Sequence, residues 1–246
     1  MSARVQTRPL RRSARPLHLR LRAYWLLGLA LLAGAAWGGW ALARAPALRV
    51  SRIEVAGNRV VSRSEILAAA GLDWRENAWL VPLGPSVRRI DALPWIATAT
   101  IARRLPATLA IAVVERTPFA CVRAPGQAFT IDASDRVLAR GCTRAPAPRF
   151  VLRAPLAVAP GRWITNPELA TLEAHARTLG RDGERYVRFA YDRFGELEAT
   201  LANGLVVHFD PDRDFARAAG EVAPVLAQLG ARRAQVRGLD LRAPQT

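Results

Sequence analysis

The chain has 246 residues, of which 36 are basic and 20 acidic, and its net charge of +16 raises the question of nucleic-acid binding. Every basic residue is an arginine, and eight of them fall within residues 1–44, so 28 arginines face 20 acidic residues in the remainder. They are spread out, without the basic stripe and interleaved aromatic residues of single-strand binders, which excludes nucleic acid as the expected partner.

The first element is an uncharged run of twenty residues, 24–43 (YWLLGLALLAGAAWGGWALA). As a helix it rises about 30 Å, the thickness of the hydrocarbon core of a bilayer, so we expect one transmembrane helix. Residues 1–23 hold seven arginines and no acidic residue, and basic residues beside a span stay in the cytoplasm. This pattern predicts a basic cytoplasmic tail, a single-pass helix in the cell inner membrane and a periplasmic part from residue 45 onward.

A cleaved secretory signal is the alternative interpretation of the same segment. Ala41-Leu42-Ala43 fits the small-residue cleavage pattern, and Arg44 would then begin the mature chain. The apolar run is longer than the ~7–15 residues of a usual signal core, which favours the retained anchor. Both interpretations send the residues that follow to the same compartment.

Residues 48–116 show a β-α-α-β-β order of predicted elements. Alternating apolar residues indicate a strand over 48–55, and Gly57-Asn58 indicates a turn. A capping box of Ser62 and Glu65 opens a helix that ends at Gly71. The later elements are a helix near 85–93 and two strands over 96–104 and 108–115.

Residues 117–242 are richer in predicted strand. Prolines indicate an irregular connection over 141–161, and Asn166-Pro167 opens a helix that ends at Gly180. Asn203-Gly204 predicts a type I′ hairpin turn. The other expected elements are strands over 128–132, 136–140, 185–191, 196–202 and 205–209, a helix over 213–230 interrupted by Pro224, and a last strand over 234–241.

No catalytic motif is evident in the sequence. The three histidines, His18, His175 and His208, lie outside any nucleophile or metal motif, and no phosphate-binding loop or nucleophile elbow is present. Asp210-x-Asp212-x-Asp214 begins like a calcium loop but lacks glycine at the sixth position, so we interpret it as a helix start. We therefore predict no catalytic residue, no cofactor, no metal site and no small-molecule substrate.

The two cysteines, Cys121 and Cys142, face an oxidising compartment in the predicted topology. Their separation permits a bridge between neighbouring strands, but spacing alone leaves a disulfide and two buried free thiols equally open. Neither cysteine belongs to the CxxC pair that a zinc site requires.

Several motifs occur in a recognisable order. They are Ile53-Glu54-Val55 with Gly57-Asn58, Leu93-Pro94-Trp95, Arg103-Arg104-Leu105-Pro106-x-x-Leu109, Val113-x-Glu115-Arg116-x-Pro118-x-Ala120, Asn203-Gly204 and Asp240-Leu241-Arg242. Together with the lone span they resemble the bacterial cell-division family FtsQ/DivIB over nearly the whole chain beyond residue 24. The resemblance implies an α+β fold: a transmembrane helix (24–43), a β-α-α-β-β POTRA domain (48–116) and a mostly antiparallel β-domain with two helices (117–242).

The resemblance also implies a function. A member of this family is expected to be a non-catalytic, bitopic scaffold of the divisome that links cytoplasmic and periplasmic division proteins at the septum. The implied partners are other division proteins, bitopic coiled-coil proteins of the FtsB and FtsL type. The alternative is a POTRA-containing accessory protein of secretion or outer-membrane assembly, but no barrel-like run of amphipathic strands follows the domain.

The last strand is the expected binding surface. We predict that strands 196–202, 205–209 and 234–241 share one antiparallel sheet with the last strand at its edge. The resemblance implies that this edge captures a membrane-proximal segment of a partner as a further strand, and the alternative is an edge that is merely covered. Of the last strand's residues, Arg237, Leu239 and Leu241 alternate on one face, and the intervening set on the other, so one set faces the core. The predicted partner-binding residues are Gln235, Val236, Arg237, Gly238, Leu239, Asp240, Leu241 and Arg242.

The end of the sequence differs from the family pattern. Members commonly continue the last strand past the Asp-Leu-Arg motif, whereas residues 243–246 (APQT) form a short C-terminal end here. Pro244 has no N–H to donate to a neighbouring strand. The short end therefore puts in doubt how much of the family's binding strand is kept.

Overall fold

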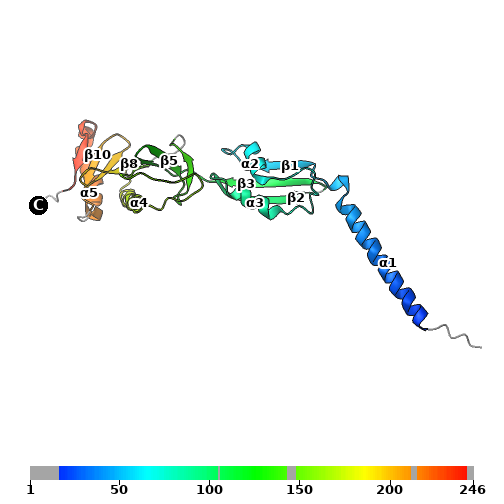
Figure 1. Cartoon of the computed structure of the whole chain (residues 1–246). Coiled ribbons are helices and arrows are strands. Elements are labelled where there is room, and N and C mark those ends of the chain that lie inside the picture. Colours follow the sequence, from blue (N-terminus) through cyan, green and yellow to red (C-terminus); the bar gives the residue numbers. More distant parts are fainter. Residues whose placement is uncertain (1–16, 105, 143–147, 212–214, 243–246) are drawn as a thin grey trace, which may run out of the picture. The chain divides into compact units, whose positions relative to one another are not determined.

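The computed structural model describes residues 17–104, 106–142, 148–211 and 215–242 (Figure 1). Backbone contacts divide the described residues into two compact units, which are taken in turn below. The first unit contains Met1–Ile53, Asp73–Val81 and Arg103–Leu109, and the second contains Glu54–Leu72, Pro82–Ala102 and Ala110–Thr246. Residues 212 and 214 of the Asp-x-Asp-x-Asp segment lie outside the described residues.

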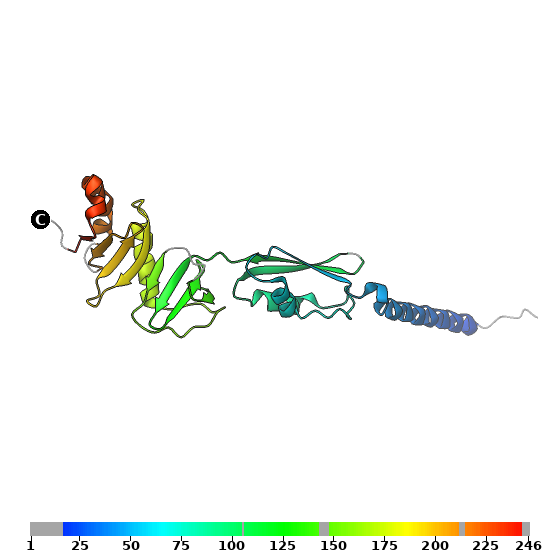
Figure 2. The ribbon, with the colours of Figure 1, turned by 90° about the horizontal axis from the view of Figure 1, so that it is seen from above.

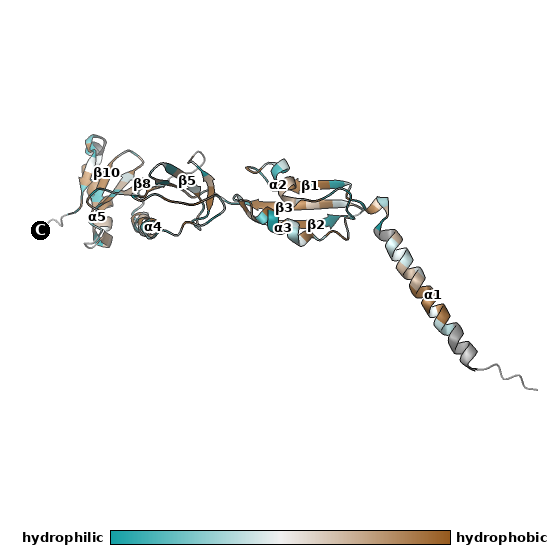
Figure 3. Ribbon diagram, viewed as in Figure 1, coloured by the Kyte–Doolittle hydropathy of each residue, from teal (hydrophilic) through white to brown (hydrophobic). Residues whose placement is uncertain are grey.

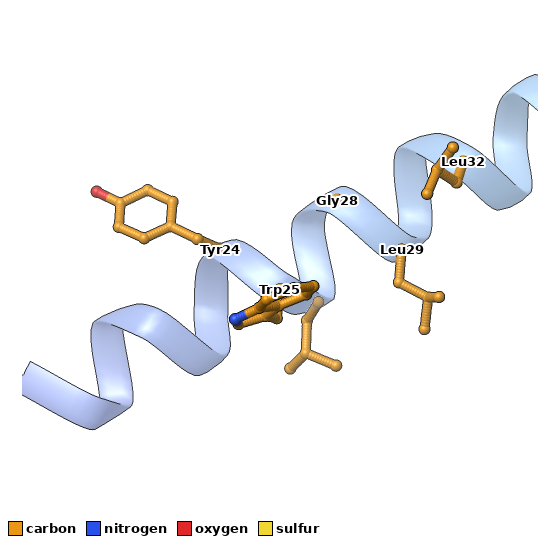
Figure 4. A pocket seen from close by; sticks show the side chains of 6 residues that line it. Tyr24, Trp25, Gly28, Leu29 and Leu32 are labelled. Carbon is orange, nitrogen blue, oxygen red and sulfur yellow. The ribbon is translucent and has the colours of Figure 1, made fainter.

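Helix α1 (Leu17–Ala43) contains the predicted span. By length and composition, Tyr24–Ala41 is the one segment of the described chain that could cross a membrane, and brown dominates the middle of this helix in Figure 3. Its large apolar side chains are exposed, Trp25 by 78%. The pocket beside Gly28 is lined only by residues of this one helix, so it is a gap between neighbouring exposed side chains (Figure 4). A helix that is apolar all round requires an apolar environment, which is consistent with a membrane anchor.

The first unit continues through a short 3₁₀ turn, η1 (Pro46–Leu48). Leu48 accepts a backbone hydrogen bond from Ala78, and Val50 donates one to Glu76. This segment therefore pairs with a loop, and the strand predicted over 48–55 begins only at Arg52, which corrects the expected boundary. The guanidinium of Arg103 donates to the carbonyls of Ala78 and Val81 and holds that loop in place.

A three-stranded sheet has the order β1-β3-β2 and is built from β1 (Arg52–Ala56), β3 (Thr108–Glu115) and β2 (Ile96–Arg104). Helices α2 (Arg63–Ala70) and α3 (Leu83–Asp91) pack on one another and lie on one face of the sheet (Figure 2). Ser62 is the predicted N-cap, because it accepts from the Glu65 amide, and Gly71 ends α2 in the left-handed conformation as expected. Helix α3 begins two residues before the expected Pro85.

The eight-stranded sheet of the second unit has the order β11-β10-β9-β8-β7-β4-β5-β6. Four neighbouring pairs are antiparallel, and the pairs β10–β11, β7–β8 and β4–β7 are parallel. In sequence order the strands are β4 (Ala120–Ala124), β5 (Gln127–Ile131), β6 (Val137–Arg140), β7 (Arg149–Val151), β8 (Tyr186–Tyr191), β9 (Leu197–Leu201), β10 (Val206–Phe209) and β11 (Gly238–Asp240).

Two of these strands were not predicted. Strand β4 carries the pattern ACVRA, in which four of the five residues are buried, so it shows no polar–apolar alternation. Strand β7 has three residues inside the connection expected to be irregular, yet it joins the two halves of the sheet and buries Phe150 completely. Short central strands of this kind leave a weak signal in sequence because neighbouring strands, rather than their own periodicity, define them.

Helix α4 (Pro167–Leu179) packs against β7, β8 and helix α5 (Phe215–Leu229), which a 3₁₀ turn, η2 (Gly230–Gln235), follows. The predicted interruption at Pro224 is wrong. Pro224 lies inside α5, where it has no N–H for the usual bond to the carbonyl four residues earlier. Burial of Ala219, Val222 and Leu226 against the core offsets that loss and keeps the helix continuous.

The hairpin between β9 and β10 also corrects a prediction. A type I′ turn requires positive φ at both central residues, but Gly204 has φ +87° and Asn203 is not in the positive-φ region. The amide of Gly204 donates to Leu201, and the amide of Leu201 donates to Leu205. The connection is a three-residue loop with glycine at the left-handed position.

Cys121 and Cys142 form a disulfide, with Cα atoms 5.4 Å apart. Cys121 is on β4 and Cys142 follows β6, so the bridge ties β4 to the segment after β6 rather than joining two neighbouring strands. This resolves the alternative that the sequence left open. The α+β fold class is confirmed, with one candidate membrane helix, a β-α-α-β-β segment and a β-rich region in that order.

Candidate partner-binding edge

Strand β11 is the edge of the eight-stranded sheet within the described residues. It pairs with β10 in the register Val206↔Gly238, Val207↔Leu239 and His208↔Asp240. The pair is parallel, which corrects the antiparallel arrangement expected for the last strand. The reason is topological: α5 and η2 carry the chain from the end of β10 back to the start of β11, as in other parallel crossovers.

The main chain of β11 has an inner and an outer edge. The amide of Val206 donates to Arg237 at 3.1 Å, and the amide of Leu241 donates to His208 at 2.9 Å, so residues 237 and 241 bond toward β10. Because successive residues of a strand direct their main-chain groups to opposite sides, Gly238 and Asp240 direct theirs away from β10. Among the described residues no strand lies on that outer side.

Strand β11 is shorter than the strand predicted over 234–241. Gln235 lies in η2, and Val236 caps it, so these two residues precede the strand. The face prediction is partly confirmed, because Leu239 and Leu241 pack against the hydrophobic core. Val236 also packs on the core, although its parity places it on the opposite face, because it lies before the strand begins.

A charged cluster holds the end of β11. Arg242 Nη1 lies 2.5 Å from Glu196 Oε2, and Arg242 Nε donates to Asp240 Oδ1 at 2.8 Å. The hydrogen bond from Arg242 lowers the pKa of Asp240 to about 2, while Asp240 and Glu196 raise the pKa of Arg242 above its usual range. The link to Glu196 has no signal in the sequence, because the two residues are 46 positions apart.

Within the described ranges, no group of three His, Cys, Asp or Glu side chains could hold a metal ion. His175 lies on α4 with Nδ1 3.3 Å from the Tyr191 hydroxyl, and burial lowers its pKa, while His208 lies on β10. Neither histidine is brought to a serine or cysteine nucleophile by any interaction of the described chain.

Comparison with known proteins adds family information. A family model described as "POTRA domain, FtsQ-type" matches residues 48–116. The chain is similar to the cell division protein FtsQ of Geobacter sp. (strain M21), with 39% identity over 95 residues (37% of this chain and 35% of the relative). It is 30% identical over 193 residues to FtsQ of Streptomyces collinus (74% of this chain and 65% of the relative).

A third relative is FtsQ of Koribacter versatilis (strain Ellin345), with 38% identity over 81 residues, or 33% of this chain and 23% of the relative. The aligned segments thus span less than two thirds of each of these curated relatives. The matches confirm the resemblance to the FtsQ/DivIB family.

Proposed function

We propose that this chain, an FtsQ relative with an FtsQ-type POTRA domain, is a non-catalytic scaffold of the bacterial divisome. In this proposal it links cytoplasmic and periplasmic division proteins at the septum and performs no reaction. The main support for this proposal is that the matching POTRA model is of the FtsQ type. This match favours a function in division over a function in secretion or outer-membrane assembly. The proposed domains are a POTRA domain at 48–116 and a β-domain at 117–242.

Depletion of the protein tests this function. Loss of a divisome scaffold should give filaments without septa, while outer-membrane proteins remain at normal levels. Normal division with depleted outer-membrane proteins would contradict the proposal and support the assembly role instead. Complementation with the full-length chain should restore septa, which assigns the phenotype to this protein.

The proposed topology is a cytoplasmic N-terminus and a periplasmic C-terminal part. The support is the charge pattern, since residues 1–23, before the apolar run, contain seven arginines and no acidic residue. A reporter active only in the periplasm should work when fused after Thr246 and be silent at the N-terminus. The reverse pattern would contradict this topology, and a mature chain that begins at Arg44 would show cleavage instead of anchoring.

We further propose that the outer edge of β11 captures the membrane-proximal segment of bitopic partners of the FtsB and FtsL type. The support is the outward main chain of Gly238 and Asp240 on an edge strand whose other side is fixed to β10. An added strand bonds mainly through main-chain groups, so side-chain changes on this edge should matter less than loss of a donor. The proposed contact residues are Arg237, Gly238, Leu239, Asp240, Leu241 and Arg242.

Two proline variants separate capture from folding. Gly238→Pro removes an outward N–H and should abolish capture with little loss of stability, since the Gly238 amide does not bond β10. Leu239→Pro removes an inward donor and buried apolar contacts, so it should lower the melting temperature. Arg237→Ala, at an exposed side chain, is the matched control and should bind normally. Undiminished capture by folded Gly238→Pro protein would overturn the assignment.

A further inference from the structure

A pocket of about 550 Å³ lies in the second compact unit, where the end of α3 meets the segment before α4. Three arginines line it, Arg88, Arg136 and Arg162, together with Asp91 and Trp163. Three guanidinium groups against one carboxylate give this pocket a local excess of two positive charges. An excess of this kind inside a concave site attracts anions.

Arg136 is the buried member of the group. Its residue is 7% exposed, and its Nε is a buried donor with no hydrogen-bond partner among the described atoms. Its Nη2 reaches the carbonyls of Asp91, Ala92 and Leu93 only at 3.4–3.5 Å. The guanidinium carbon lies 4.9 Å from the centre of the Trp163 ring, which covers one face.

The nearby carboxylate Asp132 is shared between Arg136 and Arg116, so it does not serve as a counter-ion for Arg136 only. Asp132 Oδ2 lies 2.8 Å from Arg116 Nη1, and Asp132 Oδ1 accepts from the Ser134 hydroxyl and from the backbone amide of Arg136. Burial lowers the pKa of the Arg136 guanidinium, and the charge of Arg116 lowers it further. A buried cation with an unused donor is costly, and an external counter-ion would relieve that cost.

The rim of the pocket is accessible. Arg88 and Arg162 are exposed, and within the described part of the chain neither forms an ion pair. The one acid of the pocket, Asp91, uses Oδ1 to accept the backbone amide of Ala99 at 2.7 Å. Trp163 is 53% exposed and leaves an aromatic surface beside the two rim arginines.

We propose that Arg88, Arg136 and Arg162 form a binding site for an oxyanion, a carboxylate or phosphate group of a ligand. The planar fork of a guanidinium matches the two oxygens of such a group, and several forks around one pocket bind it cooperatively. Arg136 supplies the buried donor, while Arg88 and Arg162 close on the anion from the rim. This site is separate from the β11 edge and does not depend on the proposed role in division.

Binding is measured by calorimetry on the full chain in an uncharged detergent at constant ionic strength. One arm uses inorganic phosphate, and the other uses a capped tetraglutamate peptide, which carries the same oxyanion chemistry on a protein segment. Binding in either arm supports the site, and the arm that binds more tightly identifies the source of the group. Failure of both arms overturns the proposal.

Variants at the rim keep the test independent of folding. Arg88→Gln with Arg162→Gln should weaken binding roughly tenfold or more while the melting temperature is unchanged, because both side chains are exposed. Arg181→Gln, an exposed arginine outside the pocket, is the matched control and should bind as the parent does. Arg136→Met should abolish binding. If this variant unfolds, the affinity of the Arg88→Gln, Arg162→Gln double variant decides whether the site exists. Unchanged affinity of the rim variant would overturn the proposal.

Discussion

The guanidinium of Arg116 lies 2.8 Å from the carboxylate of Asp132 and joins the end of β3 to the turn between β5 and β6. Arg116 also donates through Nε to the carbonyl of Ile96. Its neighbour Glu115 accepts the backbone amides of Arg59, Val60 and Val61. In the structure each is committed to a different neighbour, and the pair links two stretches of the second compact unit.

Asp132→Asn should destabilise the protein. Burial opposes ionisation of Asp132, but hydrogen bonds from Ser134 and Arg116 outweigh it and hold its pKa below 3.8. A lowered pKa means that its contribution is present above about pH 3.8 and is lost as the pH falls through the folded value. The variant should lose about 2–4 kcal/mol at pH 7 in chemical unfolding.

The control for this prediction is Arg153→Gln, which breaks the more exposed pair with Glu168 at 3.0 Å. Exposed pairs contribute about 0–1 kcal/mol, so this variant should be nearly neutral. Equal losses in the two variants would show that the Arg116–Asp132 pair has no special role.

Glu115→Gln should loosen the segment before α2. The carboxylate of Glu115 accepts the backbone amides of Arg59, Val60 and Val61 at 2.8–2.9 Å, and these bonds lower its pKa although burial opposes them. Gln offers one acceptor oxygen and an amide group that cannot accept, so about 1–2 kcal/mol should be lost. Hydrogen exchange at residues 59–61 should accelerate, and unchanged protection would refute this role.

The stability of the protein should carry a pH dependence from Glu173 on α4. Burial first, and then a hydrogen bond and repulsion from Asp135, raise its pKa to about 7 from 4.5, while Arg177 opposes the shift. The folded state therefore holds a proton that the unfolded state releases, so stability should fall as the pH rises from about 4.5 to 7. Glu173→Gln should remove this slope and be more stable than the parent at pH 8.

The pH dependence of stability should be compared between the parent and Glu173→Gln. This comparison isolates the effect of Glu173, because the lowered pKa of His175 changes stability with pH in the opposite direction. Its contribution is lost as the pH falls below the usual value of 6.5 and is the same in both proteins. Parallel pH profiles for parent and Glu173→Gln would show that the carboxyl does not titrate in this range.

Loss of the Cys121–Cys142 disulfide should be costly. The bridge closes a loop of 21 residues, and the chain-entropy account assigns about 3 kcal/mol to a loop of this size. The double variant Cys121→Ala with Cys142→Ala should lose about that much stability, and dithiothreitol should lower the melting temperature of the parent alone. Equal sensitivity of both proteins to the reductant would contradict the prediction.

Local signals in the sequence predicted the elements that local chemistry defines. Ser62 indicated one helix start and Asn166-Pro167 another, and the predicted bounds of β2 and β3 match the structure to the residue, whereas β1 begins four residues later than expected. The errors share a cause, because β4, β7 and the parallel pairing of β11 depend on partners far away in the chain. The edge position of the last strand was predicted, but the strand begins later than expected because Gln235 lies in a 3₁₀ turn that Val236 caps.

The arginines show the same limit. In a sequence this rich in arginine, the arginines that are solvated cannot be distinguished from those that bond to other residues of the fold. Arg89 donates to the carbonyls of Ala69 and Ala70, Arg103 donates to those of Ala78 and Val81, and Arg116 pairs with Asp132. Each of these contacts is made across at least 16 positions, so neither spacing nor periodicity reveals it.

Arg242 should control the order of the binding edge. It ties the end of β11 to Glu196, in the turn before β9, and to Asp240 on the strand itself. Arg242→Gln releases that end, so the Leu241 amide, which bonds the His208 carbonyl at 2.9 Å, should exchange faster with solvent. Partner capture should weaken with it, because a frayed edge must be ordered again when a strand is added.

The control is Glu196→Gln, which keeps the Arg242–Asp240 contact and should show a smaller effect both on amide exchange and on partner capture. Acid should reproduce the fraying only as the pH approaches about 2, where Asp240 takes up a proton. Fraying of the parent edge already near pH 5 would contradict the cluster as its anchor.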